Sequence, residues 1–309
     1  MDPTSPGFRD YWQETLEALA RYPARPEIDV VPLRTTPFAT LYGVRLTSVG
    51  AYRLFGYLTI PSGAGSFPAI YYSPKYQSVL EIIPQGTANL QRSRYITFSL
   101  AGRGQRNADS PYAAMFPGLL TERIDDAASY VFRSIVADSI RGLQFLLTRR
   151  ELDATRLVVS GNDLALITAA LAPGATHVVT APALFYDTMA LAPKTHAYPL
   201  EEINDYLRAF PAQAEAVRAT LAHYDLRAFA PRVSATTLVI AGAPGTLLDR
   251  VTLAPLITAL RGPVTVHESA QSLYKDGLVT ERWMAAQCGI EDVQAILPEH
   301  WRKAVSSEA

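Results

Sequence analysis

The segment RLVVSGNDLALITAAL, residues 156–171, places a carboxylate at a sharp turn between two apolar elements. Its first half has the continuous apolar pattern of a buried strand, and its second half is typical of a helix. The turn between them carries Asp163, preceded by Gly161 and Asn162. A carboxylate held there can attack an sp³ carbon and form an alkyl ester, which water activated by a histidine then hydrolyses. Asp163 is therefore the first candidate nucleophile.

A nucleophilic Asp163 needs a base, and only one of the five histidines lies in a segment that could place it near Asp163. His267 lies in the last strand-like run, GPVTVHES, beside Glu268. Asp249, in the loop that precedes this run, is the candidate carboxylate to orient the ring. Together these residues predict a hydrolase that acts on an unusual or non-ester substrate. The other histidines are His177, His196, His223 and His300.

Asp163 also fits this turn without doing any chemistry. Aspartate tolerates the positive φ of a strained turn better than most residues, and a carboxylate at a helix start accepts unpaired N–H groups. Such capping is worth about 0.5–2 kcal/mol. Attack of the carboxylate on an ester carbonyl gives an anhydride and places negative charge where the oxyanion must form. We therefore expect Asp163 to be a structural residue, and Lys75 is the candidate cation to neutralise it.

Two serines and one cysteine complete the set of candidate nucleophiles. Ser160 ends the strand before the turn, and Ser73 follows another buried strand, so either one can be a displaced esterase nucleophile. Cys288 has no basic neighbours and is expected to be an inert packing residue. The sequence thus leaves three hypotheses open, namely a degenerate site, an active Asp163, and a displaced serine.

The elements that position these residues alternate between strands and helices. Apolar runs at 68–74, 95–100, 156–161, 177–184 and 236–243 predict parallel core strands, and 125–149 predicts a long amphipathic helix. A first helix is expected over 8–21, then an antiparallel meander, and the last 30 residues read as helix. We predict one three-layer α/β domain over 1–309 with a central, mostly parallel sheet. It carries an N-terminal helix and arm over 1–30 and a helical insertion over 185–233.

Composition narrows the classes of function. The chain has 309 residues and a formal net charge of −1, which argues against nucleic acid or an anionic membrane as a partner. The single cysteine excludes an intrachain disulfide, and no residues have metal-ligand or phosphate-loop spacing, so no cofactor is expected. The N-terminus lacks the pattern of a signal peptide, and no apolar run reaches the ~18–20 residues of a membrane span. We expect a cytoplasmic protein.

Several blocks of the chain resemble the acetyl xylan esterase and cephalosporin C deacetylase family, carbohydrate esterase family seven. These are the opening FRDYWQETLEALARYPARPEID, the AGRGQRNADSP block, the region from Gly118 to Gly161, and the segment YPLEEINDYLRAF that opens the helical insertion. The resemblance implies an α/β-hydrolase fold and a small ester or carbohydrate-like ligand. It also implies a homo-oligomer, since the family forms hexamers whose active sites face an internal cavity.

The catalytic positions of this family are not retained. Its Gly-Gly-Ser-Gln-Gly-Gly turn corresponds to Ser160–Ala165, with Asp163 at the position of the serine. By the same resemblance, Gly245 stands for the acid and Ser272 for the histidine. Haloalkane dehalogenases and epoxide hydrolases place an aspartate at this turn on the same fold, which keeps the Asp163–His267 hypothesis open.

The accessory positions are partly retained. Tyr76 corresponds to the family's oxyanion tyrosine, while Leu164 adds bulk to the former substrate pocket. Arg103 and Gln105 match the family's Arg-Gly-Gln block and are expected to support the loops around the turn. A degenerate site predicts a small or filled pocket above Asp163 with no histidine nearby, whereas an active Asp163 requires the His267 ring beside its carboxylate.

Overall fold

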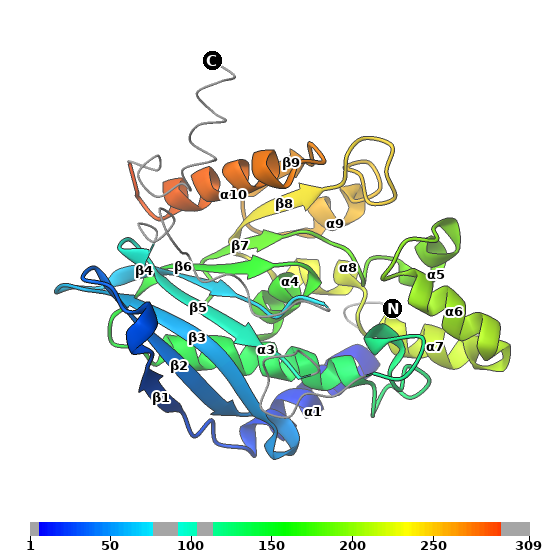
Figure 1. Cartoon of the computed structure of the whole chain (residues 1–309). Helices are drawn as coiled ribbons and strands as arrows, with labels where there is room; N and C mark the ends of the chain where they lie inside the picture. Colours follow the sequence, from blue (N-terminus) through cyan, green and yellow to red (C-terminus); the bar gives the residue numbers. More distant parts are fainter. Residues whose placement is uncertain (1–5, 77–91, 104–113, 292–309) are drawn as a thin grey trace.

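The computed structural model describes residues 6–76, 92–103 and 114–291. The described strands form one nine-stranded sheet in the order β1-β2-β3-β5-β4-β6-β7-β8-β9 (Figure 1). Their bounds are β1 Glu27–Val30, β2 Ala39–Thr47, β3 Arg53–Pro61, β4 Phe67–Tyr72, β5 Ile96–Ala101, β6 Leu152–Gly161, β7 His177–Thr180, β8 Thr236–Ala241 and β9 Val264–Glu268. Strands β1 to β3 pair antiparallel, β5 joins them antiparallel to β3, and all pairs from β5 through β4 to β9 are parallel. The predicted α/β class with a mostly parallel sheet is confirmed.

Helices cover both faces of this sheet (Figure 1). The α-helices are α1 Pro6–Ala20, α3 Val131–Leu147, α4 Asp163–Leu171, α5 Thr188–Leu191, α6 Glu201–Ala209, α7 Ala214–Ala222, α8 Leu226–Phe229, α9 Ala254–Ala259 and α10 Leu273–Gln287. Short 3₁₀ turns are η1 Pro32–Arg34, η2 Val49–Ala51, η4 Leu119–Thr121, η5 Ala192–Lys194, η6 Pro211–Gln213 and η7 Ala230–Arg232. Helices α1, α3 and α4 share the larger hydrophobic core, and α10 covers the opposite face over a smaller one. The result is a three-layer arrangement.

The central strands are apolar because water reaches neither of their faces. All six residues of β5 and the last five of β6 are buried. Helix α3 packs beneath them because its apolar residues recur at a spacing of three and four, as at Phe132, Ile135, Val136 and Ile140. These contacts hold the carboxyl ends of the parallel strands at one edge, where ligands bind in open α/β sheets.

Two elements have bounds that differ from the predicted ones, and hydrogen bonds explain both differences. The helix predicted from 125 begins at Val131, because the Asp126 carboxylate accepts the Ala128 N–H and the Ser129 hydroxyl in a preceding turn. The strand predicted over 177–184 ends at Thr180, because the N–H groups of residues 183–185 bind a side chain instead of a neighbouring strand. That side chain is Asp163.

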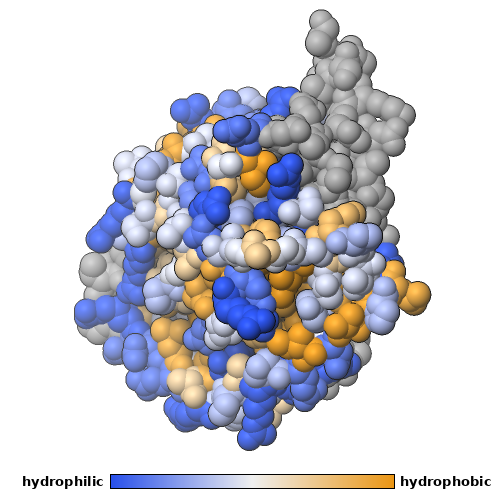
Figure 2. All heavy atoms as spheres, turned by 90° about the vertical axis from the view of Figure 1, so that its left-hand side faces the viewer, coloured by the Kyte–Doolittle hydropathy of each residue, from blue (hydrophilic) through white to orange (hydrophobic). Residues whose placement is uncertain are grey.

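Figure 2 shows the side at the left of Figure 1, where hydrophobic areas are small and interspersed with hydrophilic residues. The arrowheads of the parallel strands point away from this side (Figure 1). Two cavities lie at the opposite end, near the carboxyl ends of β6, β7 and β8. None of the described helices is long and apolar enough to cross a membrane.

Candidate functional site

Asp163 is the first residue of α4 and is completely buried. Its carboxylate accepts the backbone N–H groups of Ala183 at 3.1 Å, Leu184 at 3.1 and 3.2 Å, and Phe185 at 2.9 Å. These three N–H groups belong to the segment that follows β7. The carboxylate thus joins the start of α4 to the neighbouring loop, and its oxygens do not face a ligand cavity.

The surroundings of Asp163 differ from those expected in two respects. Asp163 does not have a positive φ, so that expectation is wrong, and the turn residue before it, Asn162, has φ −96° and ψ −136°. The carboxylate forms no ion pair with a described residue, Lys75 included. Burial raises the pKa of Asp163 above its ordinary value, against the opposing effect of the backbone N–H groups. Its partners come mainly from the loop at 183–185 rather than from the first turn of its own helix.

His267 lies on β9, but its hydrogen bond leads away from Asp163. Its Nε2 atom is 2.7 Å from Oδ1 of Asp276, a residue of α10. Asp276 also accepts the Ser269 hydroxyl at 2.7 Å and the Ala270 N–H at 2.8 Å. The structure therefore pairs His267 with Asp276, and the histidine shares no hydrogen bond with Asp163.

Asp249 has a local role instead of orienting His267. Its carboxylate accepts the N–H groups of Gly245 at 3.1 Å and of Thr252 at 2.8 Å, which closes the turn after β8. Gly245 has φ +79°, a left-handed conformation that suits glycine. Ser272 caps α10 by accepting the Lys275 N–H at 3.3 Å. The positions of the family's acid and histidine thus hold a turn and a helix cap.

The remaining described histidines have other neighbours. His177 bonds Thr176, His196 lies 3.5 Å from Glu201 at the surface, and His223 stacks on Tyr11. His300 and Gln105 lie outside the described residues. No described histidine is hydrogen-bonded to Asp163.

The hydroxyl of Tyr76 is engaged by a buried carboxylate that sequence analysis missed. Tyr76 donates to Oε1 of Glu202, on α6 of the insertion, and the Leu120 N–H donates to Oε2 at 3.0 Å. Glu202 is completely buried, and burial raises its pKa. The cavity left beside Tyr76 and Leu164 measures only about 10 Å³, too small for an acyl group. In sequence, Glu202 is indistinguishable from an ordinary acidic residue in the first turn of a helix.

The Arg103 guanidinium is bonded to groups of two other elements. Its guanidinium binds the fully buried Asp138 of α3 through Nε at 2.8 Å and Nη2 at 3.0 Å. The same group donates to the Val49 carbonyl at 2.8 Å and lies 4.7 Å from the centre of the Tyr52 ring. Arg103 thereby ties the end of β5 to α3 and to the turn before β3.

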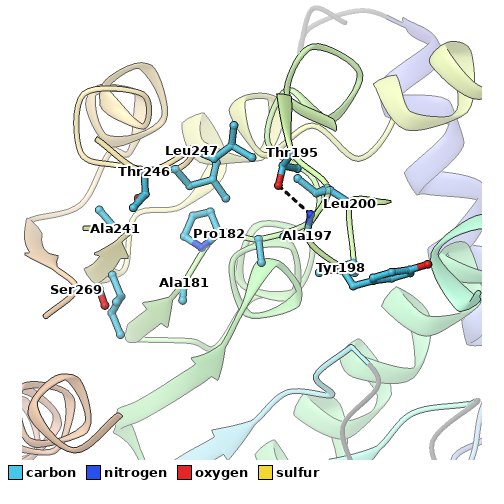
Figure 3. A pocket seen from close by; sticks show the side chains of 15 residues that line it. Ala181, Pro182, Thr195, Ala197, Tyr198, Leu200, Ala241, Thr246, Leu247 and Ser269 are labelled. Atoms are coloured by element: carbon cyan, nitrogen blue, oxygen red, sulfur yellow. Dashed lines mark hydrogen bonds between the residues drawn. The ribbon is translucent and has the colours of Figure 1, made fainter. Parts of the chain in front are cut away.

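An apolar pocket of about 410 Å³ lies over the carboxyl ends of β7 and β8 (Figure 3). We call it the apolar pocket, and it is bounded by the segment after β7, the loop after β8 and the start of the insertion. Its polar side chains are already bonded within the protein: Thr195 accepts the Ala197 N–H, Thr246 donates to the Ala243 carbonyl, and Ser269 donates to Asp276. Its lining includes Ala181, Pro182, Ala183, Leu200, Ile240, Ala241, Leu247, Leu248 and Ser269.

Asp163 and the apolar pocket are connected through one loop. Ala183, whose N–H binds the Asp163 carboxylate, lines the pocket together with Pro182. Because the carboxylate holds three successive N–H groups, it determines the course of the chain along this wall. Asp163 is thus a positioning residue for the pocket.

The bonds of Asp276 predict a pH-dependent contribution to stability. Burial raises the pKa of this carboxyl, but the bonds from Ser269, Ala270 and His267 outweigh it and leave the pKa below the ordinary value of 3.8. A depressed pKa contributes stability above pH ~4 that is lost as the pH falls through the folded-state pKa. We expect Asp276→Asn to lower the free energy of unfolding by about 1–2 kcal/mol at pH 7, and the difference to shrink by pH 3. Urea denaturation at both pH values measures it, and the exposed Asp29→Asn is the control. An equal difference at both pH values would contradict the assignment.

The parallel sheet, the strand–turn–helix at 156–171 and the cavities at the strand ends define the α/β-hydrolase class. The family model described as acetyl xylan esterase (AXE1) matches residues 1–260, and the chain belongs to this family. It is 23% identical over 248 residues to the acetyl esterase Axe7A of Xylanibacter ruminicola, covering 76% of this chain and 55% of that protein. The chain thus spans about half the length of this curated relative.

Solved structures support the same fold. The acetyl xylan esterase from Paenibacillus sp. R4 superposes with a TM-score of 0.80 at 22% identity, covering 93% of this chain and 96% of that one. Acetyl xylan esterase 1 from Thermoanaerobacterium sp. JW/SL YS485 gives 0.80 at 20% identity, with coverage of 93% and 95%. At these identities the likeness establishes the fold alone.

Proposed function

We propose that this family member binds a small ester-like ligand in the apolar pocket and does not hydrolyse acetyl esters. The observation that carries the proposal is the state of Asp163, whose carboxylate is fully buried and bonded to three backbone N–H groups. A nucleophile must reach the substrate and a base must activate water, and the described residues provide neither at Asp163. Tyr76, which would stabilise an oxyanion, is engaged by Glu202.

The lining of the apolar pocket indicates the kind of ligand. A pocket whose polar groups are already bonded gains little from binding charged molecules, whereas burial of apolar surface is worth about 25 cal/mol per Å². A volume of about 410 Å³ falls within the ~300–1,000 Å³ typical of small-molecule sites. We therefore propose an uncharged, mainly apolar ligand such as a short-chain ester.

Hydrolysis of p-nitrophenyl acetate tests the catalytic half of the proposal. The purified wild-type protein is expected to show no turnover above buffer, since loss of serine-triad members costs about 10⁴–10⁶ in rate. Asp163→Asn, Ser160→Ala and Ser73→Ala are measured beside it. Turnover that vanishes in Ser160→Ala but persists in Asp163→Asn would instead establish a displaced serine. Turnover that vanishes only in Asp163→Asn would establish an active aspartate.

Binding of ethyl butyrate, followed by ligand-observed NMR, tests the other half. Wild type is expected to bind it, and Leu247→Trp, which fills the apolar pocket, is expected to weaken binding at least tenfold. Val251→Trp, at a highly exposed position in the loop after β8, is the matched control and should leave binding unchanged. Equal binding by Leu247→Trp and wild type would contradict the proposed site.

A further inference from the structure

One wall of the apolar pocket is formed by a single short segment of the helical insertion. We call residues 192–200 the wall segment. It contributes Thr195, Ala197, Tyr198, Pro199 and Leu200 to the lining. Thr195 lies across the pocket from Leu247, which belongs to the loop after β8 (Figure 3). The space available to a ligand therefore depends on the course of the wall segment.

The wall segment packs on the core only at its two ends. Ala192 and Leu200 are buried, whereas none of residues 193–199 is buried and Tyr198 is 60% exposed. Little apolar surface is thus removed from water along the middle of the segment, and hydrophobic burial contributes little to its position. Hydrogen bonds to another element must therefore fix its course.

Helix α6 provides these hydrogen bonds from one polar face. The residues of this face recur at a spacing of three and four, and they are Glu201, Asn204, Asp205 and Arg208. Asp205 accepts the Tyr198 hydroxyl at 2.9 Å. None of the four residues lines the apolar pocket, so they act on the pocket only through the wall segment.

Asn204 makes the central contact between α6 and the wall segment. Its Nδ2 atom lies 2.9 Å from the carbonyl oxygen of Ala192 and 3.0 Å from that of Thr195. The same atom lies 2.7 Å from Oε2 of Glu201, so its two hydrogens are shared among three acceptors. Because all three neighbours only accept, the amide must point its NH₂ group at them. One side chain thereby holds the start and the middle of the wall segment.

The charged residues beside Asn204 hold the polar face in place. Arg208 donates to Oε1 of Glu201 at 2.6 Å and also to Asp205. Hydrogen bonds from Asn204 and Arg208 hold the pKa of Glu201 at about 2, below its ordinary value of 4.5. Glu201 is therefore ionised at neutral pH and keeps Asn204 oriented toward the wall segment.

We infer that Asn204 is a positioning residue of the apolar pocket, which fixes the wall segment and thereby limits the length of the ligand that the pocket accepts. The limit on ligand length rests on the proposed function, because it concerns the ligand bound there. The hold on the wall segment is a property of the free protein and can be measured without a ligand.

Hydrogen exchange of the full chain, followed by mass spectrometry, tests the hold on the wall segment. In Asn204→Ala the amides of residues 192–200 are expected to exchange about tenfold faster, because the segment loses its bonds to α6. Alanine favours a helix more than asparagine does, so α6 itself should remain formed. Asn204→Asp, which keeps the size but replaces the donor, should act in the same way. Gln213→Ala is the matched control, since this exposed amide side chain of the insertion bonds no described residue.

Ligand-observed NMR with ethyl butyrate and ethyl octanoate tests the limit on ligand length. The affinity for ethyl octanoate relative to ethyl butyrate is expected to rise at least fivefold in Asn204→Ala, because a released wall segment can move aside for the longer chain. A variant that had only lost stability would bind both esters less by the same factor. Unchanged exchange in both Asn204 variants, or an unchanged ratio of the two affinities, would overturn the inference. If wild type bound neither ester, the proposed function and the limit on length would fail, while faster exchange would still support the hold on the wall segment.

Discussion

Asp163→Ala is expected to lower the free energy of unfolding by about 3–5 kcal/mol. The variant leaves the N–H groups of Ala183, Leu184 and Phe185 without their acceptor, and Leu184 and Phe185 are buried. Each unsatisfied buried N–H costs about 1–3 kcal/mol, and removal of the buried carboxylate offsets part of the sum. Urea denaturation followed by circular dichroism measures the change.

Two comparisons make this result specific. Asp126→Ala also removes a carboxylate that accepts backbone and hydroxyl hydrogens, but at an exposed turn, and should cost less than about 1 kcal/mol. Asp163→Asn keeps the size of the side chain and one acceptor, so it should fall between the two. A loss below about 1 kcal/mol in Asp163→Ala would refute the structural role of this carboxylate. Such a result would return Asp163 to the set of possible nucleophiles.

The fold could be predicted largely from local patterns, because the central strands are buried on both faces and read as continuous apolar runs. The run PAIYYSP contains residues 68–72 of β4, and RLVVSG contains the buried part of β6. The residues at which helices and strands begin and end could be predicted less well. The early end of β7 depends on Asp163, a residue on another element, and a period-two pattern carries no sign of that contact.

The site was predictable only where a residue acts on its own segment. That Asp249 and Ser272 sit at a turn and a helix start follows from their immediate neighbours. The partner of His267 was not predictable, because Asp276 approaches it only when α10 folds back over the sheet edge. The same limit applies to Glu202, whose partners are 82 and 126 residues away along the chain.

The hydrogen bonds of Asp163 and Glu202 have the same structural effect. In this chain the polar groups near the turn before α4 bind one another or the backbone, and so they stabilise the neighbouring loops. Asp163 holds the segment after β7, and Glu202 holds Tyr76 and the turn at Leu120. A catalytic role for Asp163 or Tyr76 would require each of them to exchange these bonds for bonds to substrate.

Gly118→Ala is expected to destabilise the protein by about 2–4 kcal/mol, because a Cβ at this position would lie 2.4 Å from the Glu202 carboxyl group. The methyl group must displace that carboxylate, which then loses the Leu120 N–H and the Tyr76 hydroxyl. The insertion helix α6 would be released from the turn at Leu119–Thr121. Thermal and urea denaturation of the full chain measure the loss.

A double-mutant cycle separates this clash from any other effect of adding a methyl group. Glu202→Ala alone should cost about 2–3 kcal/mol, since it leaves the same two donors unpaired. In the double variant the methyl group has room, although alanine at φ +158° stays strained, so Gly118→Ala should cost at least about 1 kcal/mol less there than in the wild-type background. Additive losses would show that Gly118 and Glu202 act independently. Strong coupling would instead identify the close approach of this glycine as the reason the Glu202 carboxylate can lie beside it and hold Tyr76.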